Sequence, residues 1–203
     1  MSRKSTAKQR LTDAAWEMIW EHSYGATSVD SICERADVRK GSFYYFFKSK
    51  SDLAAAALEA DWQKSKPELD GIFSPSVPPL ERLKRYFDSS RERLECIKKQ
   101  CGEVLGCPLF TLGSEICTQD TVLRDKVQEI LERKLAYLES TIRDAHAAGL
   151  VDSPDAKAQA RGLSALFEGT LTQARIENSS EPLSGLYASA LSLLGAKSEA
   201  ATV

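Results

Sequence analysis

The sequence has few of the residues that most enzymes and metal centres require. It contains only two histidines, His22 and His146, and they stand far apart. No glycine-rich phosphate loop, metal-ligand spacing or Ser-His-Asp set accompanies them. The pairs of acidic residues on helical faces are typical of solvated surface. We therefore expect a protein that is not an enzyme and has no cofactor and no bound metal.

Long apolar runs and clustered cysteines are also missing. No apolar run approaches the roughly 20 residues that cross a bilayer, and the beginning, MSRKSTAKQR, has no apolar signal core. The five cysteines are spread along the chain instead of standing at disulfide or zinc-finger spacings. These absences favour a cytoplasmic protein in a reducing compartment, with no membrane partner.

Charge is unevenly distributed, although the net charge is only -2. Residues 1–52 contain nine Lys or Arg and seven Asp or Glu, whereas the rest of the chain contains eighteen and twenty-two. Any polyanionic partner is therefore expected to bind the N-terminal quarter. The hydrophobic fraction of 42% is sufficient for a sizeable core.

Apolar residues recur with a period near 3.6 along almost the whole chain, and no segment shows sustained alternation. This pattern predicts an all-α protein. Three short helices are expected at residues 7–22, 29–36 and 39–46. Ser49 then has the position of an N-cap that starts a longer helix.

The long helix contains Pro67, which we expect to kink or end it. Residues 71–79, GIFSPSVPP, form the clearest break in the chain. We accordingly predict three parts, namely a helix-turn-helix DNA-binding domain over residues 1–52, a connecting helix and loop over residues 53–78, and a C-terminal helical ligand-binding and dimerisation domain over residues 79–203.

The segment VRKGSFYYFFKSKSDL places five consecutive aromatic residues among four basic ones. Phe43, Phe46 and Phe47 share one helical face and are expected to pack on the preceding helix. Tyr44 and Tyr45 point elsewhere, together with basic residues. A phenolic hydroxyl donates well to a phosphate oxygen and lysine adds charge, so the outer face suits DNA. A solvated rim around a core face is the alternative interpretation.

The stretch TSVDSICERADVRKGSFYYFFKSKSDL resembles the DNA-binding domain of the TetR family of bacterial transcriptional regulators, over about residues 7–58. Two positions depart from the family pattern: Asp37 stands where glycine is usual, and Arg39 replaces the usual helix-capping Ser or Thr. The resemblance and the outer-face argument together assign to DNA binding Thr27, Arg39, Lys40, Gly41, Ser42, Tyr44, Tyr45, Lys48 and Lys50.

The same resemblance implies a homodimeric regulator that binds double-stranded operator DNA and an inducer. We expect a repressor that a small lipophilic or electrophilic effector releases. A helical ligand-binding or enzyme-like protein without DNA binding is the alternative. The C-terminal stretches GCPLFTLGSE, AHAAGLV and LFEGTLTQAR are similar to a TetR subgroup that includes regulators of multidrug export and of electrophile-responsive reductases.

The C-terminal helices supply apolar and phenolic side chains for an effector site. The candidates are Phe87, Cys107, Phe110, Tyr137 and Phe167. Cys107 precedes Pro108 at an expected helix start, where the helix dipole favours a reactive thiolate. Ordinary core packing of the aromatic residues and a buried, inert thiol remain the alternatives.

The last two helices have wide apolar faces that suit a four-helix bundle with a second copy. Gly169 would allow close approach of another helix. The alternative is that these faces close the core of a monomer. The residues predicted for the dimer interface are Leu163, Phe167, Thr170, Leu171, Ala174, Leu186, Ala190 and Leu193.

Overall fold

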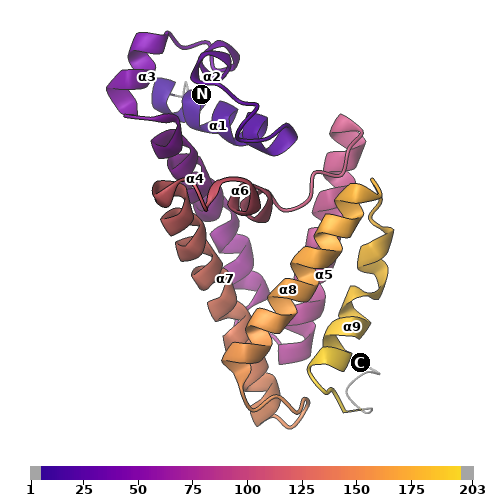
Figure 1. The fold of residues 1–203 in the computed structure, drawn as a ribbon. Helices are drawn as coiled ribbons and strands as arrows, with labels where there is room; N and C mark the ends of the chain where they lie inside the picture. The colour runs from indigo at the N-terminus through magenta and orange to yellow at the C-terminus, as the bar shows by residue number, and fades with distance from the viewer. Residues whose placement is uncertain (1–5, 198–203) are drawn as a thin grey trace, which may run out of the picture. The chain divides into compact units, whose positions relative to one another are not determined.

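The computed structural model describes residues 6–197, and over that range the chain is helical, as the apolar period predicts (Figure 1). An isolated antiparallel bridge between Val151 and Ala196 accompanies the helices. No helix in the described range is long and apolar enough to cross a membrane. The helices are α1 (Ala7–Glu21), α2 (Val29–Arg35), α3 (Lys40–Phe46), α4 (Lys50–Ile72), α5 (Pro79–Cys101), α6 (Pro108–Ile116), α7 (Thr121–Ala147), α8 (Ala156–Ile176), the 3-10 helix η1 (Glu181–Gly185) and α9 (Leu186–Leu193).

The described chain packs as two compact units. The first contains the residues up to Ser65 together with residues 108–130, and the second contains residues 66–107 and the residues from Leu131 onward. The domains predicted from the sequence are continuous stretches of chain, whereas each compact unit combines two separate stretches. Helix α6 packs on α1, although more than 85 residues separate them in the chain.

Helices α1, α2 and α3 enclose the core of the first unit. Their innermost side chains include Leu11, Ile32 and Phe43, and Leu53 from the first turn of α4 completes the group. The two short helices cannot bury their own apolar faces alone, because a helix of seven residues is marginal in water without tertiary contacts. Packing against α1 therefore fixes the orientation of α2 and α3.

Side-chain caps define where two of these helices begin. The Ser28 hydroxyl accepts from the backbone N–H of Ser31, and the Ser31 hydroxyl accepts from the backbone N–H of Ser28, which forms a capping box for α2. Ser49 accepts from the backbone N–H of Asp52 at the start of α4. These contacts satisfy N–H groups that have no partner inside their own helix.

Pro67 does not end the long helix, because α4 continues from Lys50 to Ile72. The ring of Pro67 is exposed to solvent. Water can therefore hydrate the helical carbonyl that proline leaves without its usual N–H donor. Of the two outcomes predicted for this position, termination of the helix is wrong.

The core of the second unit contains most of the residues predicted for the dimer interface. Helix α8 lies beside α9 and η1 (Figure 1), and their facing side chains are buried within the single chain. A partner copy cannot cover side chains that one chain already encloses. The predicted interface residues that are buried in the chain are Leu163, Phe167, Thr170, Leu171, Ala174, Leu186 and Ala190. Leu193, by contrast, is 42% exposed.

Candidate nucleic-acid interface and effector core

The turn between α2 and α3 depends on a backbone conformation that few residues adopt. Asp37 has a φ of 49°, in the left-handed region where Asp is tolerated better than most residues. The Arg10 guanidinium on α1 donates to the carbonyls of Ala36 and Asp37, both at 3.0 Å. Arg10 therefore ties the turn to α1, a role that no sequence motif indicated.

The aromatic run of α3 divides as its spacing predicts. Phe43 and Phe47 are buried and Phe46 is half-buried, whereas Tyr44 and Tyr45 are 59% and 82% exposed. The Tyr44 ring makes an edge contact with Phe43, with centroids 5.0 Å apart, and the Tyr45 ring makes a similar contact with Phe46 at 4.9 Å. The inner rings thus support two exposed phenols on the outer face.

Basic side chains precede and follow these phenols in the chain. Arg39, Lys40 and Lys48 are all exposed. The Lys40 ammonium lies 2.6 Å from a carboxylate oxygen of Asp30 on α2, and this hydrogen bond raises the pKa of Lys40. Arg39 precedes α3 without a side-chain cap in the described structure, as expected for its sequence, so its guanidinium is not used to start the helix.

Gly41 provides a gap on the same surface. It is exposed, and a Cβ added to it would have no described atom within 4 Å. Because Gly41 has no side chain, a flat or bulky partner can approach the first turn of α3 closely. Ser42 follows with a half-buried side chain. Together with the phenols and the basic residues, this gap forms what we call the outer face of α3.

Thr27 and Lys50, which were predicted to face DNA, have partners inside the fold. Thr27 is 1% exposed, and its hydroxyl donates to the carbonyl of Ser23 at 2.7 Å. The Lys50 ammonium donates to the carbonyls of Tyr24 and Thr27 at 2.8 and 2.9 Å, and it lies 3.9 Å from the centroid of the Tyr24 ring. Desolvation lowers the pKa of Lys50. In this structure both residues stabilise the turn before α2.

Helix α6 holds the other side of that turn. The Glu115 carboxylate accepts from the backbone N–H groups of Tyr24 at 3.0 Å and Gly25 at 2.7 Å. The Tyr24 hydroxyl bonds to Ser51, and Ser51 in turn donates to Asp120, which caps α7. Sequence reasoning missed this network, because acidic residues on a helix give no sign of a partner 90 positions away.

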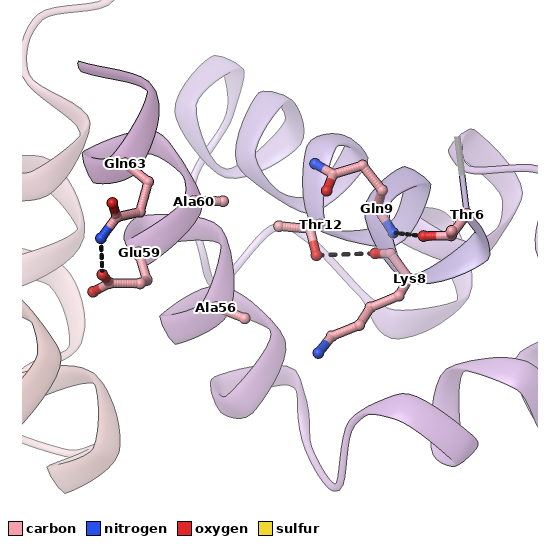
Figure 2. Close-up of a pocket in the computed structure, with 8 residues that line it drawn as sticks. All are labelled: Thr6, Lys8, Gln9, Thr12, Ala56, Glu59, Ala60 and Gln63. Carbon is pink, nitrogen blue, oxygen red and sulfur yellow. Dashed lines mark hydrogen bonds between the residues drawn. The ribbon is translucent and has the colours of Figure 1, made fainter. Parts of the chain in front are cut away.

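A shallow groove lies between α1 and α4 in the first unit (Figure 2). The Thr12 hydroxyl donates to the carbonyl of Lys8 at 3.0 Å, and Gln63 donates to Glu59 at 2.8 Å. Both of these bonds lie within single helices, and Glu59 also accepts from the Lys126 ammonium of α7 at 3.2 Å. The polar groups do not converge on a common point (Figure 2). We assign no function to the groove, whose lining consists of Thr6, Lys8, Gln9, Thr12, Ala56, Glu59, Ala60 and Gln63.

Five aromatic rings form a connected cluster in the second unit. Tyr86 on α5 is central, with ring centroids 5.0 Å from Phe167 and 5.2 Å from Phe73. Phe87 contacts Phe167 at 5.6 Å, and Tyr137 stacks on Phe73 at 5.1 Å. The cluster contains three of the residues predicted for the effector site and adds Tyr86 and Phe73. The remaining predicted aromatic residue, Phe110, belongs to α6 in the first unit.

A buried acidic group lies next to this cluster. Glu168 follows Phe167 on α8 and is 6% exposed. It forms a side-chain hydrogen bond with Cys107, while desolvation raises its pKa and the charge of Lys134 partly offsets that effect. Burial raises the pKa of Tyr86 to about 12. The predicted Cys107 therefore has an acidic neighbour that the sequence pattern did not reveal.

Comparison with known families identifies the chain. The profile of the bacterial regulatory proteins of the tetR family matches residues 11–57. The profile described as the tetracyclin repressor-like C-terminal domain matches residues 79–189. The chain belongs to the TetR family. A member of the TetR family is a helix-turn-helix transcriptional regulator that binds DNA, and not an enzyme.

Curated TetR-family relatives match most of the chain. The transcriptional regulator AcuR of Cereibacter sphaeroides is 31% identical over 183 residues, which cover 88% of this chain and 81% of the relative. The transcriptional repressor DhaR of Mycobacterium sp. strain GP1 is 26% identical, covering 89% and 88%. The alignments thus extend through both the DNA-binding and the C-terminal regions.

Solved TetR-family structures share the fold. A regulatory protein TetR from Rhodobacter sphaeroides superposes with a TM-score of 0.81 at 29% identity, covering 92% of this chain and 97% of that one. The reduced form of NemR from E. coli has a TM-score of 0.82 at 22% identity, covering 95% and 98%. The second likeness concerns the fold alone.

Proposed function

We propose that this TetR-family regulator is a repressor and that the outer face of α3 binds operator DNA. The observation that carries the proposal is the combination of two exposed tyrosines, three exposed basic side chains and Gly41 within residues 39–48. Phenols, cations and an open backbone are the groups that contact phosphates and groove edges. The relatives DhaR and NemR are named repressors. The operator lies in the bacterial cytoplasm, where we place the protein.

We propose that the regulator acts as a homodimer. On α8, the positions 162, 165, 169 and 176 fall on one outward stripe and are all exposed. Three of them are Gly or Ala, and Ile176 is 79% exposed. Small residues let a second helix approach closely, and an exposed isoleucine supplies apolar area. A two-fold dimer would present two copies of α3 to successive major grooves, about 34 to 36 Å apart.

We propose that a small lipophilic or electrophilic effector binds at the aromatic cluster of the second unit and relieves repression. Tyr86, Cys107 and Tyr137 remain partly exposed, so the cluster is open to ligands. Effector and operator binding would be linked by roughly 1 to 3 kcal/mol, which changes operator affinity about 5- to 150-fold. The Cys107 thiol is the group that an electrophile would modify. If Cys107→Ser leaves release by quinones unchanged, thiol modification is not the trigger.

Salt dependence tests the DNA-binding proposal. The operator is first identified by sequencing DNA fragments selected by the purified protein, and its affinity is then measured by gel shift at several salt concentrations. Lys48→Ala should weaken binding and reduce the log-log salt slope by about one per protomer, because one phosphate contact is lost. Lys99→Ala, an exposed lysine of α5, is the control and should leave the slope unchanged. Absence of DNA binding by the wild type at low salt would contradict the proposal.

A further inference from the structure

One oxygen of the buried Glu168 carboxyl group has no hydrogen-bond partner within the described residues. The atom is Oε2, and it is fully shielded from solvent. An unpaired buried acceptor costs about 1 to 3 kcal/mol, so natural proteins rarely retain one without a use. Thr141 carries the other such atom in the described chain, but its neutral hydroxyl is less costly to bury than a carboxyl oxygen.

The surroundings of Glu168 indicate what the oxygen is for. The preceding residue, Phe167, contacts the rings of both Tyr86 and Phe87. Tyr86 experiences the charges of Glu168 and Cys107, which places all three groups in one neighbourhood. Apolar walls that supply affinity and a few polar groups that supply orientation are the usual composition of a small-molecule site, and an unpartnered carboxyl oxygen beside this aromatic cluster fits that composition.

The existing partners of Glu168 leave this oxygen available. Cys107 hydrogen-bonds to the side chain, and Lys134 acts on it through its charge. Neither contact gives Oε2 a hydrogen bond within the described residues. A carboxylate has room for about four hydrogen bonds, so a donor that displaces the side chains covering Oε2 can bind there while Cys107 keeps its own bond. A ligand that has only acceptors would instead place an acceptor atom against Oε2, and the two would repel each other.

We propose that Glu168 is the polar anchor of the effector site, and that the effector is a small molecule with an apolar body of about one ring and an N–H or O–H donor. The proposal rests on the proposed effector function of the second unit and specifies the ligand chemistry of that site. Molecules of the same size without a donor would leave Oε2 unpaired, and sites built around such a group reject analogues that lack the matching donor.

The test uses four matched probes and the purified full-length chain without DNA. The probes are 2-phenylethylamine and 2-phenylethanol, which carry donors, and ethylbenzene and phenylacetate, which do not. Calorimetry gives each dissociation constant, and thermal shifts provide a second measure of binding. Wild-type protein should bind both donor probes at least about tenfold more tightly than ethylbenzene, the difference expected for one hydrogen bond to a charged group.

Three variants separate an anchoring role from a structural one. Glu168→Gln should abolish the preference for donors by removing the charge. Tyr86→Phe removes the phenolic hydroxyl of the central ring but keeps the ring, and should retain the preference. Glu177→Gln, on the exposed end of α8, should match the wild type. Circular dichroism confirms that each variant is folded, and a change in melting temperature with unchanged probe ranking in Glu168→Gln would show that Glu168 is only structural.

Several results would overturn the proposal. These are equal binding of ethylbenzene and the donor probes, preferential binding of phenylacetate, no binding of any probe, or loss of the preference in Tyr86→Phe instead of Glu168→Gln. Because the probes are tested on the free protein, failure here is distinct from failure to bind operator DNA, which the gel shift measures separately.

Discussion

At the scale of single residues, we expect two exposed glycines, Gly41 and Gly71, to differ in function although their surroundings are alike. Both lie in helices, and neither would bring a new Cβ within 4 Å of a described atom. Neither has a positive φ. Gly41 lies on the outer face of α3, whereas Gly71 lies near the end of α4. Alanine substitutions at these two positions can therefore be compared directly.

Gly41→Ala should stabilise the protein but weaken operator binding. Alanine favours the helix over glycine by up to about 1 kcal/mol, whereas the methyl group would hold the DNA backbone away from the first turn of α3. Loss of one backbone contact corresponds to roughly tenfold weaker binding. Thermal unfolding and gel shifts measure the two effects. Gly71→Ala, the matched control, should stabilise without changing affinity; equal affinity in both variants would remove Gly41 from the interface.

Arg82 is a second residue whose role depends on burial. Its guanidinium donates to Asp144 at 2.6 Å and to the carbonyls of Val77 and Pro75 at 2.7 and 3.2 Å. Arg82 is almost fully buried, so these partners would lose a charged donor if it were removed. The contacts link the loop before α5 to α7 within the second unit.

Arg82→Met should lower the free energy of unfolding by about 2 to 4 kcal/mol, because several charge-assisted hydrogen bonds are lost and Asp144 loses its partner. Urea unfolding measures the change. Arg85→Met provides the control, since the Arg85–Glu81 pair on the same helix is exposed, and such pairs contribute at most about 1 kcal/mol. Similar losses in the two variants would show that burial of Arg82 contributes little.

At the scale of elements, contact between α6 and the turn before α2 is fixed by one close approach. A Cβ on Gly25 would lie 2.9 Å from an oxygen of Glu115. Gly25→Ala should therefore break the hydrogen bonds that backbone N–H groups donate to Glu115 and destabilise the first unit by about 1 to 3 kcal/mol. In a Glu115→Ala background the same change should have little effect. Thermal unfolding of the wild type, the two single variants and the double variant gives the coupling energy. Equal effects of Gly25→Ala in both backgrounds would show that Gly25 and Glu115 are not coupled.

The sequence pattern was sufficient for most helices and for the division of the aromatic run. The apolar period, the cap at Ser49, and the spacing of Phe43 and Phe47 are local properties, so they can be interpreted without coordinates. The inward orientation of Leu163 and its neighbours depends instead on contacts between helices that are distant in the sequence. Periodicity shows that a helix has an apolar face, but it does not show whether that face meets the same chain or a second copy.

Lys50 and Glu168 illustrate the same limit in the candidate sites. The spacing of Lys50 fits a phosphate contact, yet its ammonium binds two carbonyls that come from the turn more than 20 residues earlier. Glu168 on α8 looks like any other helical acid in the sequence. Its importance comes from burial beside rings of α5, and such long-range burial has no signature in a single sequence.

At the scale of the whole molecule, the proposed dimer requires the outward stripe of α8. Gly169 is exposed, and a Cβ there would have no described atom within 4 Å, so Gly169→Glu should leave the monomer folded. In a dimer the stripe would be paired with its symmetry mate, and a charge buried there without a partner costs several kcal/mol. The variant should therefore sediment as a monomer and bind the operator far more weakly, since each protomer alone contacts one half-site. Gly185 is also exposed and equally open, so Gly185→Glu is the matched control and should remain dimeric. A dimeric Gly169→Glu protein with full operator affinity would place the interface elsewhere on the chain.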